Sequence, residues 1–251
     1  MIKLVDVYKS FGTKDVLSGF SLEVLEGETM VIIGYSGTGK SVAIKHIVGL
    51  LDPDAGEVWV DGMRVDRLGR RELSELRARI GYVFQFAALF DSLTIGENVA
   101  MGLRKRSGLS EREIRDRVND TLELVDLPGV ENRFPAELSG GMRKRVGIAR
   151  AIALRPKYIL YDEPTTGLDP VTSAVINELM IRMREKLGVT SIVITHDMKS
   201  AFDVGSRIAM LYEGSIRQVG TVDEIKRSTD PVVRQFIEGR PSLESSGAAA
   251  D

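Results

Sequence analysis

The sequence predicts an α/β fold built on a sheet with buried parallel strands. Three apolar runs have the composition of strands covered on both faces: Met30 to Ile33, Tyr158 to Asp162 and Ser191 to Thr195. Segments with helical periodicity lie between them, and polar or glycine residues follow the end of each run. Because ligands bind at the carboxyl ends of strands in such sheets, we expect the functional residues at these three points.

The first run leads into Gly34-Tyr35-Ser36-Gly37-Thr38-Gly39-Lys40-Ser41, which fits the phosphate-loop pattern. Its glycines allow consecutive N–H groups to surround a phosphate, Lys40 can reach the β- and γ-phosphates, and Ser41 can ligate Mg²⁺. An ordinary glycine-rich turn is the alternative. A chance match occurs in about one chain in a hundred, and more rarely between a strand and a helix, so the pattern favours nucleotide binding. The helix that follows is predicted by Ile44, Ile47, Val48 and Leu51 on one face.

Composition limits the possible classes of protein. The 251 residues have a formal charge of −2, no cysteine and two histidines, which excludes disulfides, thiolate metal sites and a histidine-rich metal centre. The charge gives no general attraction to nucleic acid. The N-terminus lacks a signal-peptide pattern, and no apolar run approaches the ~18–20 residues that cross a bilayer. We expect a soluble, intracellular chain that reaches membranes through a partner.

The first 86 residues predict further strands. Residues 2–7 and 20–25 alternate as half-buried strands, with turns at Gly12 and Gly27, and residues 58–60 and 80–84 form two more. Phe11 can stack on a base or serve as a packing residue. Gln85, at the end of a strand, is by itself an ordinary surface amide.

Residues 87–154 change character and predict helices. Capping boxes occur at Thr94/Glu97 and at Ser110/Glu113. The apolar segment 87–90 precedes the first of them, and two interpretations stay open for it: local core, or a docking surface for another protein.

A second anion site is indicated where Leu138-Ser139-Gly140-Gly141-Met142 precedes a basic helix. Ser139 is a natural N-cap, and the two glycines leave backbone N–H groups uncovered. The alternative is a capped helix with a solvated basic face.

Two acids end the strand at residues 158–163. Asp162 can hold Mg²⁺ through water, and Glu163 can polarise an attacking water. Acids there can also be simple turn residues, but this is a weaker interpretation beside a phosphate loop. His196 ends the next strand, where it can contact a phosphate or make a structural hydrogen bond. Asp169-Pro170 predicts the start of a helix whose apolar stripe runs from Val171 to Leu187.

The C-terminal part predicts two short strands, at 208–211 and 216–219, a helix capped by Thr221/Glu224, and a helix at 232–237. Residues 239–251 are small and polar, and we expect them to be disordered.

Together these residues resemble the ATPase subunit of ATP-binding-cassette (ABC) transporters over about residues 1–238. The motifs are GYSGTGKS (34–41), Gln85, LSGGM (138–142), YILYDEP (158–164), LD (168–169) and His196. The resemblance implies a P-loop NTPase core (1–86 and 155–238), an N-terminal antiparallel β-subdomain and an inserted α-helical subdomain (87–154).

The resemblance also implies ATP and Mg²⁺ as cofactors, and a head-to-tail homodimer in which two chains close each ATP. By this resemblance, Phe11 stacks on the adenine base, and Gly34 to Ser41 with the following Val42 hold the phosphates. The residues that contact Mg²⁺, directly or through water, are Ser41, Gln85 and Asp162. Glu163 resembles the catalytic base, His196 the switch histidine, and Gln85 a residue that senses the permease. Ser139, Gly140, Gly141 and Asp169 resemble residues that act across the subunit interface.

Two positions depart from the pattern: Met142 replaces a glutamine, and Val42 replaces a frequent hydroxyl residue. A weaker nucleotide grip is expected from Val42. Some relatives have a longer tail that contacts the sister subunit. The tail here is short, and we do not expect this contact.

The segments RKRVGIARAIAL, FQFAALFDSLTIGENVA and DPVVRQFIEG are similar to those of Mla-type ATPases. This implies transport of phospholipid between bacterial membranes with a permease and an MCE substrate-binding protein, and a place on the cytoplasmic face of the inner membrane. An importer ATPase for amino acids or other polar solutes, and a non-transport ATPase such as an iron–sulfur assembly subunit, are the alternatives.

Overall fold

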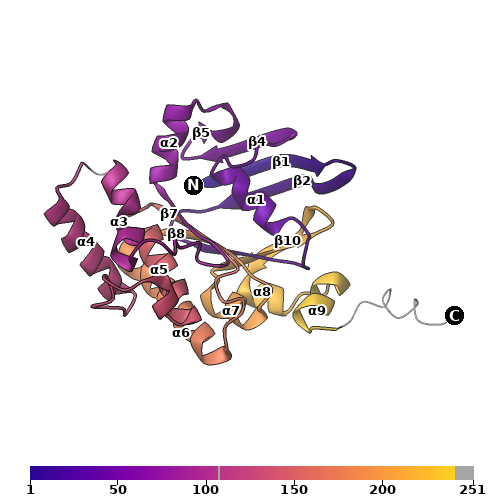
Figure 1. The fold of residues 1–251 in the computed structure, drawn as a ribbon. Helices are drawn as coiled ribbons and strands as arrows, with labels where there is room; N and C mark the ends of the chain where they lie inside the picture. Colours follow the sequence, from indigo (N-terminus) through magenta and orange to yellow (C-terminus); the bar gives the residue numbers. More distant parts are fainter. Residues whose placement is uncertain (107, 241–251) are drawn as a thin grey trace.

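The computed structural model describes residues 1–106 and 108–240, which form two β-sheets with helices around them (Figure 1). The N-terminal sheet has the order β2-β1-β4-β5 and is antiparallel. Its strands are β1 (Ile2–Phe11), β2 (Lys14–Val24), β4 (Ala55–Val60) and β5 (Met63–Arg64). β1 continues to Phe11 and β2 begins at Lys14, so both include residues outside the predicted ranges. The prediction missed these residues because the strand register shifts between Leu4 and Val7, around Asp6 with φ 46°, and this shift interrupts the simple alternation of buried and exposed residues.

The central sheet has the order β10-β9-β3-β8-β7-β6, and only the edge strand β10 is antiparallel to its neighbour. Its strands are β3 (Thr29–Ile33), β6 (Ile80–Val83), β7 (Tyr158–Asp162), β8 (Thr190–Ile194), β9 (Arg207–Tyr212) and β10 (Ser215–Thr221). Every residue of β3, β7 and β8 is buried, as expected of strands covered on both faces. Since these three strands are parallel, Gly34, Glu163 and His196 lie along one edge of the sheet.

The described helices are α1 (Lys40–Ile47), α2 (Arg70–Ala78), α3 (Ile95–Arg106), α4 (Glu111–Leu124), α5 (Gly140–Ile152), α6 (Pro170–Leu187), α7 (Met198–Val204), α8 (Val222–Lys226) and α9 (Pro231–Ile237), with 3₁₀ turns η1 (Val65–Arg67) and η2 (Pro135–Glu137). α1 ends one turn earlier than predicted, because Gly49 follows it with φ 59° and turns the chain away. α2 was not predicted, since Leu76 is its one buried residue and no apolar stripe marks it.

The three capping boxes are confirmed. Glu97 Oε2 accepts from Thr94 N at 2.8 Å, Glu113 Oε2 from Ser110 N at 2.8 Å, and Glu224 Oε2 from Thr221 N at 2.7 Å. Each reciprocal bond, from the glutamate N–H to the hydroxyl, is also present. These caps fix where α3, α4 and α8 begin.

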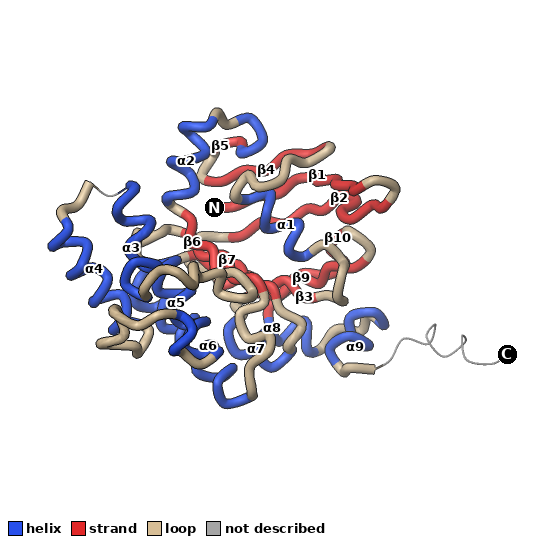
Figure 2. Tube along the Cα trace, in the orientation of Figure 1, coloured by secondary structure: helices blue, strands red, loops and turns tan. Residues whose placement is uncertain are grey.

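Helices α3, α4 and α5 gather on one side of the strands (Figure 2). One apolar cluster contains their buried residues together with Ile159 and Tyr161 of β7, and a second joins α1 to the antiparallel sheet and the other face of the central sheet. The first cluster contains residues from both the predicted core and the predicted helical subdomain (87–154). The proposed division between these two parts therefore stays a prediction.

The predicted disordered tail falls mainly on residues 241–251, which lie outside the described residues. Within 1–106 and 108–240, no helix combines the length and the apolar character needed to cross a membrane.

Candidate functional site

The loop at residues 34–41 joins β3 to α1 and is open to an anion. Gly39 precedes α1 with φ 101°, and a Cβ there would lie 2.8 Å from Val16 Cγ1, so the position requires glycine. No side chain caps α1, and its first turn has no acidic residue. The helix dipole and the free N–H groups therefore favour a phosphate at this point.

Lys40 spans the loop from inside. Its ammonium donates to the Gly34 and Tyr35 carbonyls, both at 2.8 Å, and the residue is 7% exposed. Burial lowers the Lys40 pKa, an effect opposed by the nearby carboxylates of Glu163 and Asp162. A buried cation held by carbonyls at a helix N-terminus is suited to a phosphate oxygen.

Tyr35 and Thr38 stabilise the loop through their side chains and do not line the cleft beside it. Thr38 Oγ1 donates to the Tyr35 carbonyl at 2.9 Å. The Tyr35 ring packs edge-on against Phe236 at 5.0 Å and Tyr212 at 6.5 Å instead of lining the cleft. The loop is thereby attached to α9 and to the end of β9.

A cleft of about 380 Å³ beside this loop brings together most of the predicted residues from distant parts of the sequence. It is lined by Phe11, Val16, Ser36, Gly37, Gly39, Lys40, Ser41, Val42, Gln85, Glu163 and His196. Val16 was not predicted, since an apolar residue in a strand carries no sequence signal for ligand contact.

Asp162 lies next to Ser41 and fits a magnesium site. Its Oδ1 accepts from Ser41 Oγ at 2.7 Å and its Oδ2 from Tyr82 Oη at 3.1 Å. Burial and the Asp162 carboxylate raise the pKa of Tyr82, so this phenol stays a donor. Among residues 1–106 and 108–240, no cluster of three His, Cys, Asp or Glu side chains could hold a metal alone. The hydroxyl and carboxylate fit Mg²⁺, which prefers a few protein oxygens plus substrate phosphates and water.

Glu163 follows β7 in a left-handed conformation, with φ 51°. Its Oε2 lies 2.9 Å from His196 Nδ1 and accepts from Thr166 Oγ1 at 3.0 Å. Its N–H donates to the Ile194 carbonyl at 3.0 Å. The Glu163 carboxylate is thus fixed at the cleft, and His196 contacts it in this structure.

The second predicted anion site lies outside the cleft. Ser139 caps α5 by accepting from Met142 N at 3.3 Å, and Asp169 caps α6 by accepting from Val171 N and Thr172 N at 3.0 Å. A Cβ on Gly141 would lie 2.5 Å from Thr172 Cγ2, so the two helix starts are adjacent. Hydrogen bonds from Thr172 lower the Asp169 pKa. Val171 and Val175 are 76% and 38% exposed, so the predicted apolar stripe of α6 is wrong at its first two residues.

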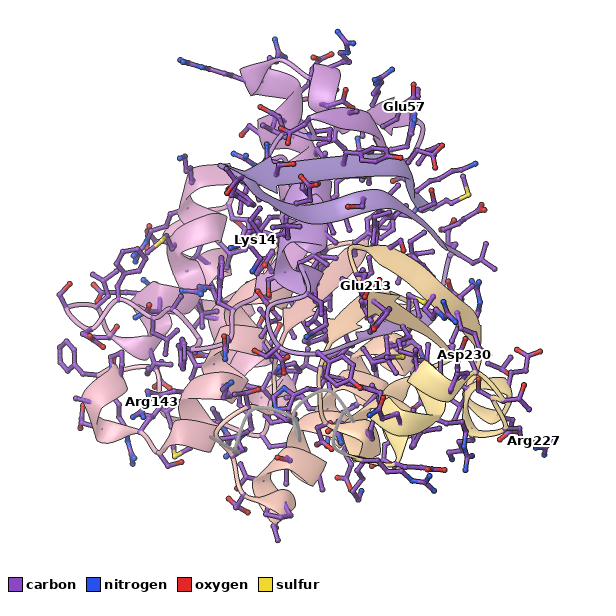
Figure 3. All side chains as sticks on the ribbon, turned by 90° about the vertical axis from the view of Figure 1, so that its right-hand side faces the viewer. Lys14, Glu57, Arg143, Glu213, Arg227 and Asp230 are labelled. Carbon is purple, nitrogen blue, oxygen red and sulfur yellow. The ribbon has the colours of Figure 1, made fainter. Side chains whose placement is uncertain are left out.

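The basic helix α5 is divided between surface and interior. Arg143, labelled in Figure 3, is exposed, whereas Lys144 is 7% exposed. Within residues 87–90, Ala87 is buried, as the local-core interpretation expects, but Phe90 is 52% exposed and the neighbouring Phe86 is 83% exposed. The docking interpretation of this segment stays a prediction. The burial of Lys144 next to the exposed Arg143 is the feature that the sequence did not indicate.

Comparisons with known proteins agree with this geometry. The ABC transporter family model matches residues 17–166, more than half of the chain. Protein TRIGALACTOSYLDIACYLGLYCEROL 3, chloroplastic, from Arabidopsis thaliana is 44% identical over 95% of this chain and 74% of its own length. The probable ribonucleotide transport ATP-binding protein mkl of Mycobacterium leprae is 41% identical over 95% of this chain and 69% of its own.

A solved structure of the ATP-binding cassette MJ0796, dimeric, in a post-hydrolysis state and bound to ADP and Pi, superposes with a TM-score of 0.81. It is 37% identical and covers 88% of this chain and 99% of its own. The predicted fold class, the ATPase activity and the two cofactors are thereby confirmed. This chain belongs to the ABC transporter family and is an ATPase that uses ATP and Mg²⁺.

Proposed function

We propose that this chain powers a membrane transporter that moves phospholipids, as one of two identical ATPase subunits attached to a permease. The observation that carries the catalytic part is the contact of Glu163 with His196 at the edge of the cleft that holds Lys40 and Ser41. This contact supports the assignment of Glu163 as a base and His196 as its partner, because hydrolysis needs such a pair beside the phosphate loop.

In this proposal each residue has one task. The loop N–H groups and Lys40 bind the β- and γ-phosphates, and Phe11, 48% exposed at the rim, stacks on adenine. Ser41, Asp162 and Gln85 are on the metal side, where Mg²⁺ neutralises phosphate charge. Glu163 accepts a proton from the attacking water, and His196 holds the Glu163 carboxylate and reaches toward the γ-phosphate.

A homodimer accounts for the second anion site. Ser139, Gly140 and Asp169 form no part of the cleft in their own chain, yet they are exposed together with Val171. Head-to-tail pairing would place this surface over the nucleotide of the sister chain. The dimeric state of MJ0796 supports a dimer for this chain as well.

The exposed aromatic residues near Gln85 support a permease contact. Phe84, Phe86 and Phe90 are 38%, 83% and 52% exposed, an unusual concentration on one short segment. Since Gln85 lines the cleft, a partner seated on this segment would act directly on the site. The chain would then lie on the cytoplasmic face of the inner membrane.

Phospholipid is our choice of substrate, with an MCE protein as the substrate-binding partner. It is supported by the Mla-like segments and by the similarity to a protein named after a diacylglycerol lipid. The similarity to a protein named for ribonucleotide transport favours a second candidate, an importer of polar solutes.

The role of Glu163 is tested by Glu163→Gln. We expect the rate of hydrolysis to fall by about 10²- to 10⁴-fold, because the base is lost, while ATP still binds and holds the dimer together. Single-turnover hydrolysis and size-exclusion chromatography with Mg-ATP measure both effects. Normal turnover would exclude Glu163 as the base.

The transported substrate is tested by affinity purification from gently solubilised native membranes, with mass spectrometry of proteins and lipids. Glu163→Gln with Mg-ATP is the bait, and Lys40→Ala is the control that cannot bind nucleotide. A permease with an MCE protein and phospholipid supports the proposal. A permease with a solute-binding protein favours the importer, and soluble partners alone favour a non-transport ATPase such as an assembly subunit.

A further inference from the structure

Lys144 connects two residues of the cleft to helix α5. Its ammonium donates to the Gln85 carbonyl and lies 3.3 Å from the Glu163 carbonyl, which it also donates to. Gln85 follows β6 and Glu163 follows β7, so the two accepting residues come from different strand ends. Their side chains both line the nucleotide cleft, whereas Lys144 itself does not.

The same face of α5 holds the segment after Gln85. Lys144, Gly147 and Arg150 follow one another at three-residue spacing and therefore lie on one side of the helix. Arg150 donates to the carbonyls of Ala88 at 2.6 Å and Ala87 at 2.7 Å. A Cβ on Gly147 would lie 3.3 Å from Ala87 Cβ, so glycine allows the close approach.

The backbone that these cations hold is strained. Ala87, Ala88 and Glu163 have φ values of 59°, 48° and 51°, which non-glycine residues rarely adopt. Such conformations are unfavourable by themselves and persist where the surroundings fix them. Hydrogen bonds from Lys144 and Arg150 to these carbonyls are contacts of this kind.

Packing alone does not explain a lysine at this position. Burial lowers the Lys144 pKa, which shows that the ammonium gives up hydration there, while the Glu163 charge acts in the opposite direction. An apolar side chain would fill the same space without this cost. The hydrogen bonds to the two carbonyls that the ammonium joins offset this cost.

We propose that Lys144 is a positioning residue for hydrolysis: it fixes the backbone of Gln85 and Glu163 to α5, so that both side chains are aligned on the nucleotide. α5 begins at Ser139 and Gly140, so a nucleotide contact at that end is linked through one rigid helix to the base. The inference rests on the proposed role of Glu163.

The test compares Lys144→Met with Lys144→Arg and with Lys186→Met, a control at an exposed lysine near the far end of α6. For Lys144→Met we expect kcat to fall by about 10- to 100-fold, the scale of a misplaced catalytic group, with KM for ATP within about twofold. Lys144→Arg restores part of kcat because it keeps the charge, and the control leaves both constants unchanged.

A double-mutant cycle separates positioning from a merely structural role. In a Gln85→Ala background, Lys144→Met should lower kcat by less than half of its effect in the wild type, because the two residues act together. Equal effects in both backgrounds, or a wild-type kcat in Lys144→Met, would overturn the inference. If Lys144→Met does not fold, Lys144→Leu removes the N–H donor with a different apolar side chain, and a wild-type kcat there would overturn the inference equally.

The two proposals can fail separately. If Glu163→Gln retains turnover, the role of Glu163 is wrong and the inference about Lys144 is lost with it. If Glu163→Gln is inactive and Lys144→Met is fully active, the inference about Lys144 alone is wrong.

Discussion

The N-termini of helices α1 and α5 have similar local features but different surroundings. α1 begins after the glycine-rich loop and α5 begins with Gly140 and Gly141, and neither helix has an acidic residue in its first turn. α1 starts beside a cleft of about 380 Å³, with Lys40 inside the loop and Asp162 and Glu163 opposite. α5 starts at exposed Ser139 and Gly140, next to exposed Val171.

The difference supports our proposal that one chain contains a nearly complete phosphate site at α1 and half of a second one at α5. The helix dipole and free N–H groups are common to both ends, so they do not determine which one binds nucleotide within a chain. The determining features are the cation and the acids that the central sheet brings to α1. Three substitutions test this comparison.

Lys40→Ala breaks the α1 site and has the largest expected effect. We expect ATP affinity of the isolated chain to fall by about 100-fold or more, since loss of a buried charge partner costs about 2–5 kcal/mol, and hydrolysis to fall to background. Titration calorimetry measures the affinity. Wild-type affinity would mean that the α1 loop does not hold the phosphates.

Gly140→Val breaks the α5 end and leaves α1 intact. The nearest atom to a Cβ at Gly140 is Arg143 Nη2 at 4.0 Å, so the side chain fits within its own chain. We expect unchanged ATP binding by the isolated chain but hydrolysis reduced by about 100-fold, because the methyl groups obstruct the sister nucleotide. Calorimetry measures ATP binding and steady-state assays measure the ATPase rate. An unchanged rate would show that the N-terminus of α5 does not contact the nucleotide of the sister chain.

Val42→Thr sharpens the α1 site and has the smallest effect. Val42 lines the cleft and also packs on the second apolar cluster, so threonine keeps the shape and adds a hydroxyl. One net hydrogen bond stabilises by about 0.5–1.5 kcal/mol, and we expect ATP to bind about threefold more tightly. Weaker binding would show that the hydroxyl finds no phosphate oxygen.

The sequence determined the local parts of this molecule. The buried strands, the three capping boxes and the phosphate loop follow from composition and spacing within a few residues, because strand burial, helix capping and turn conformation depend on near neighbours. Helix α2 and the end of α1 were missed, since an apolar stripe is absent in one and Gly49 ends the other. The roles of the site residues remain predictions.

Only the tertiary structure decided how the parts meet. Tyr82 and Lys144 lie 80 and 19 residues from the acids that they contact, and nothing in their local sequence marks these hydrogen bonds. The same holds for Tyr35 against Phe236, and for Gly141 against Thr172. Such contacts arise because parallel strands bring distant chain segments to one edge of a sheet, and only their order in the sheet determines which segments become neighbours.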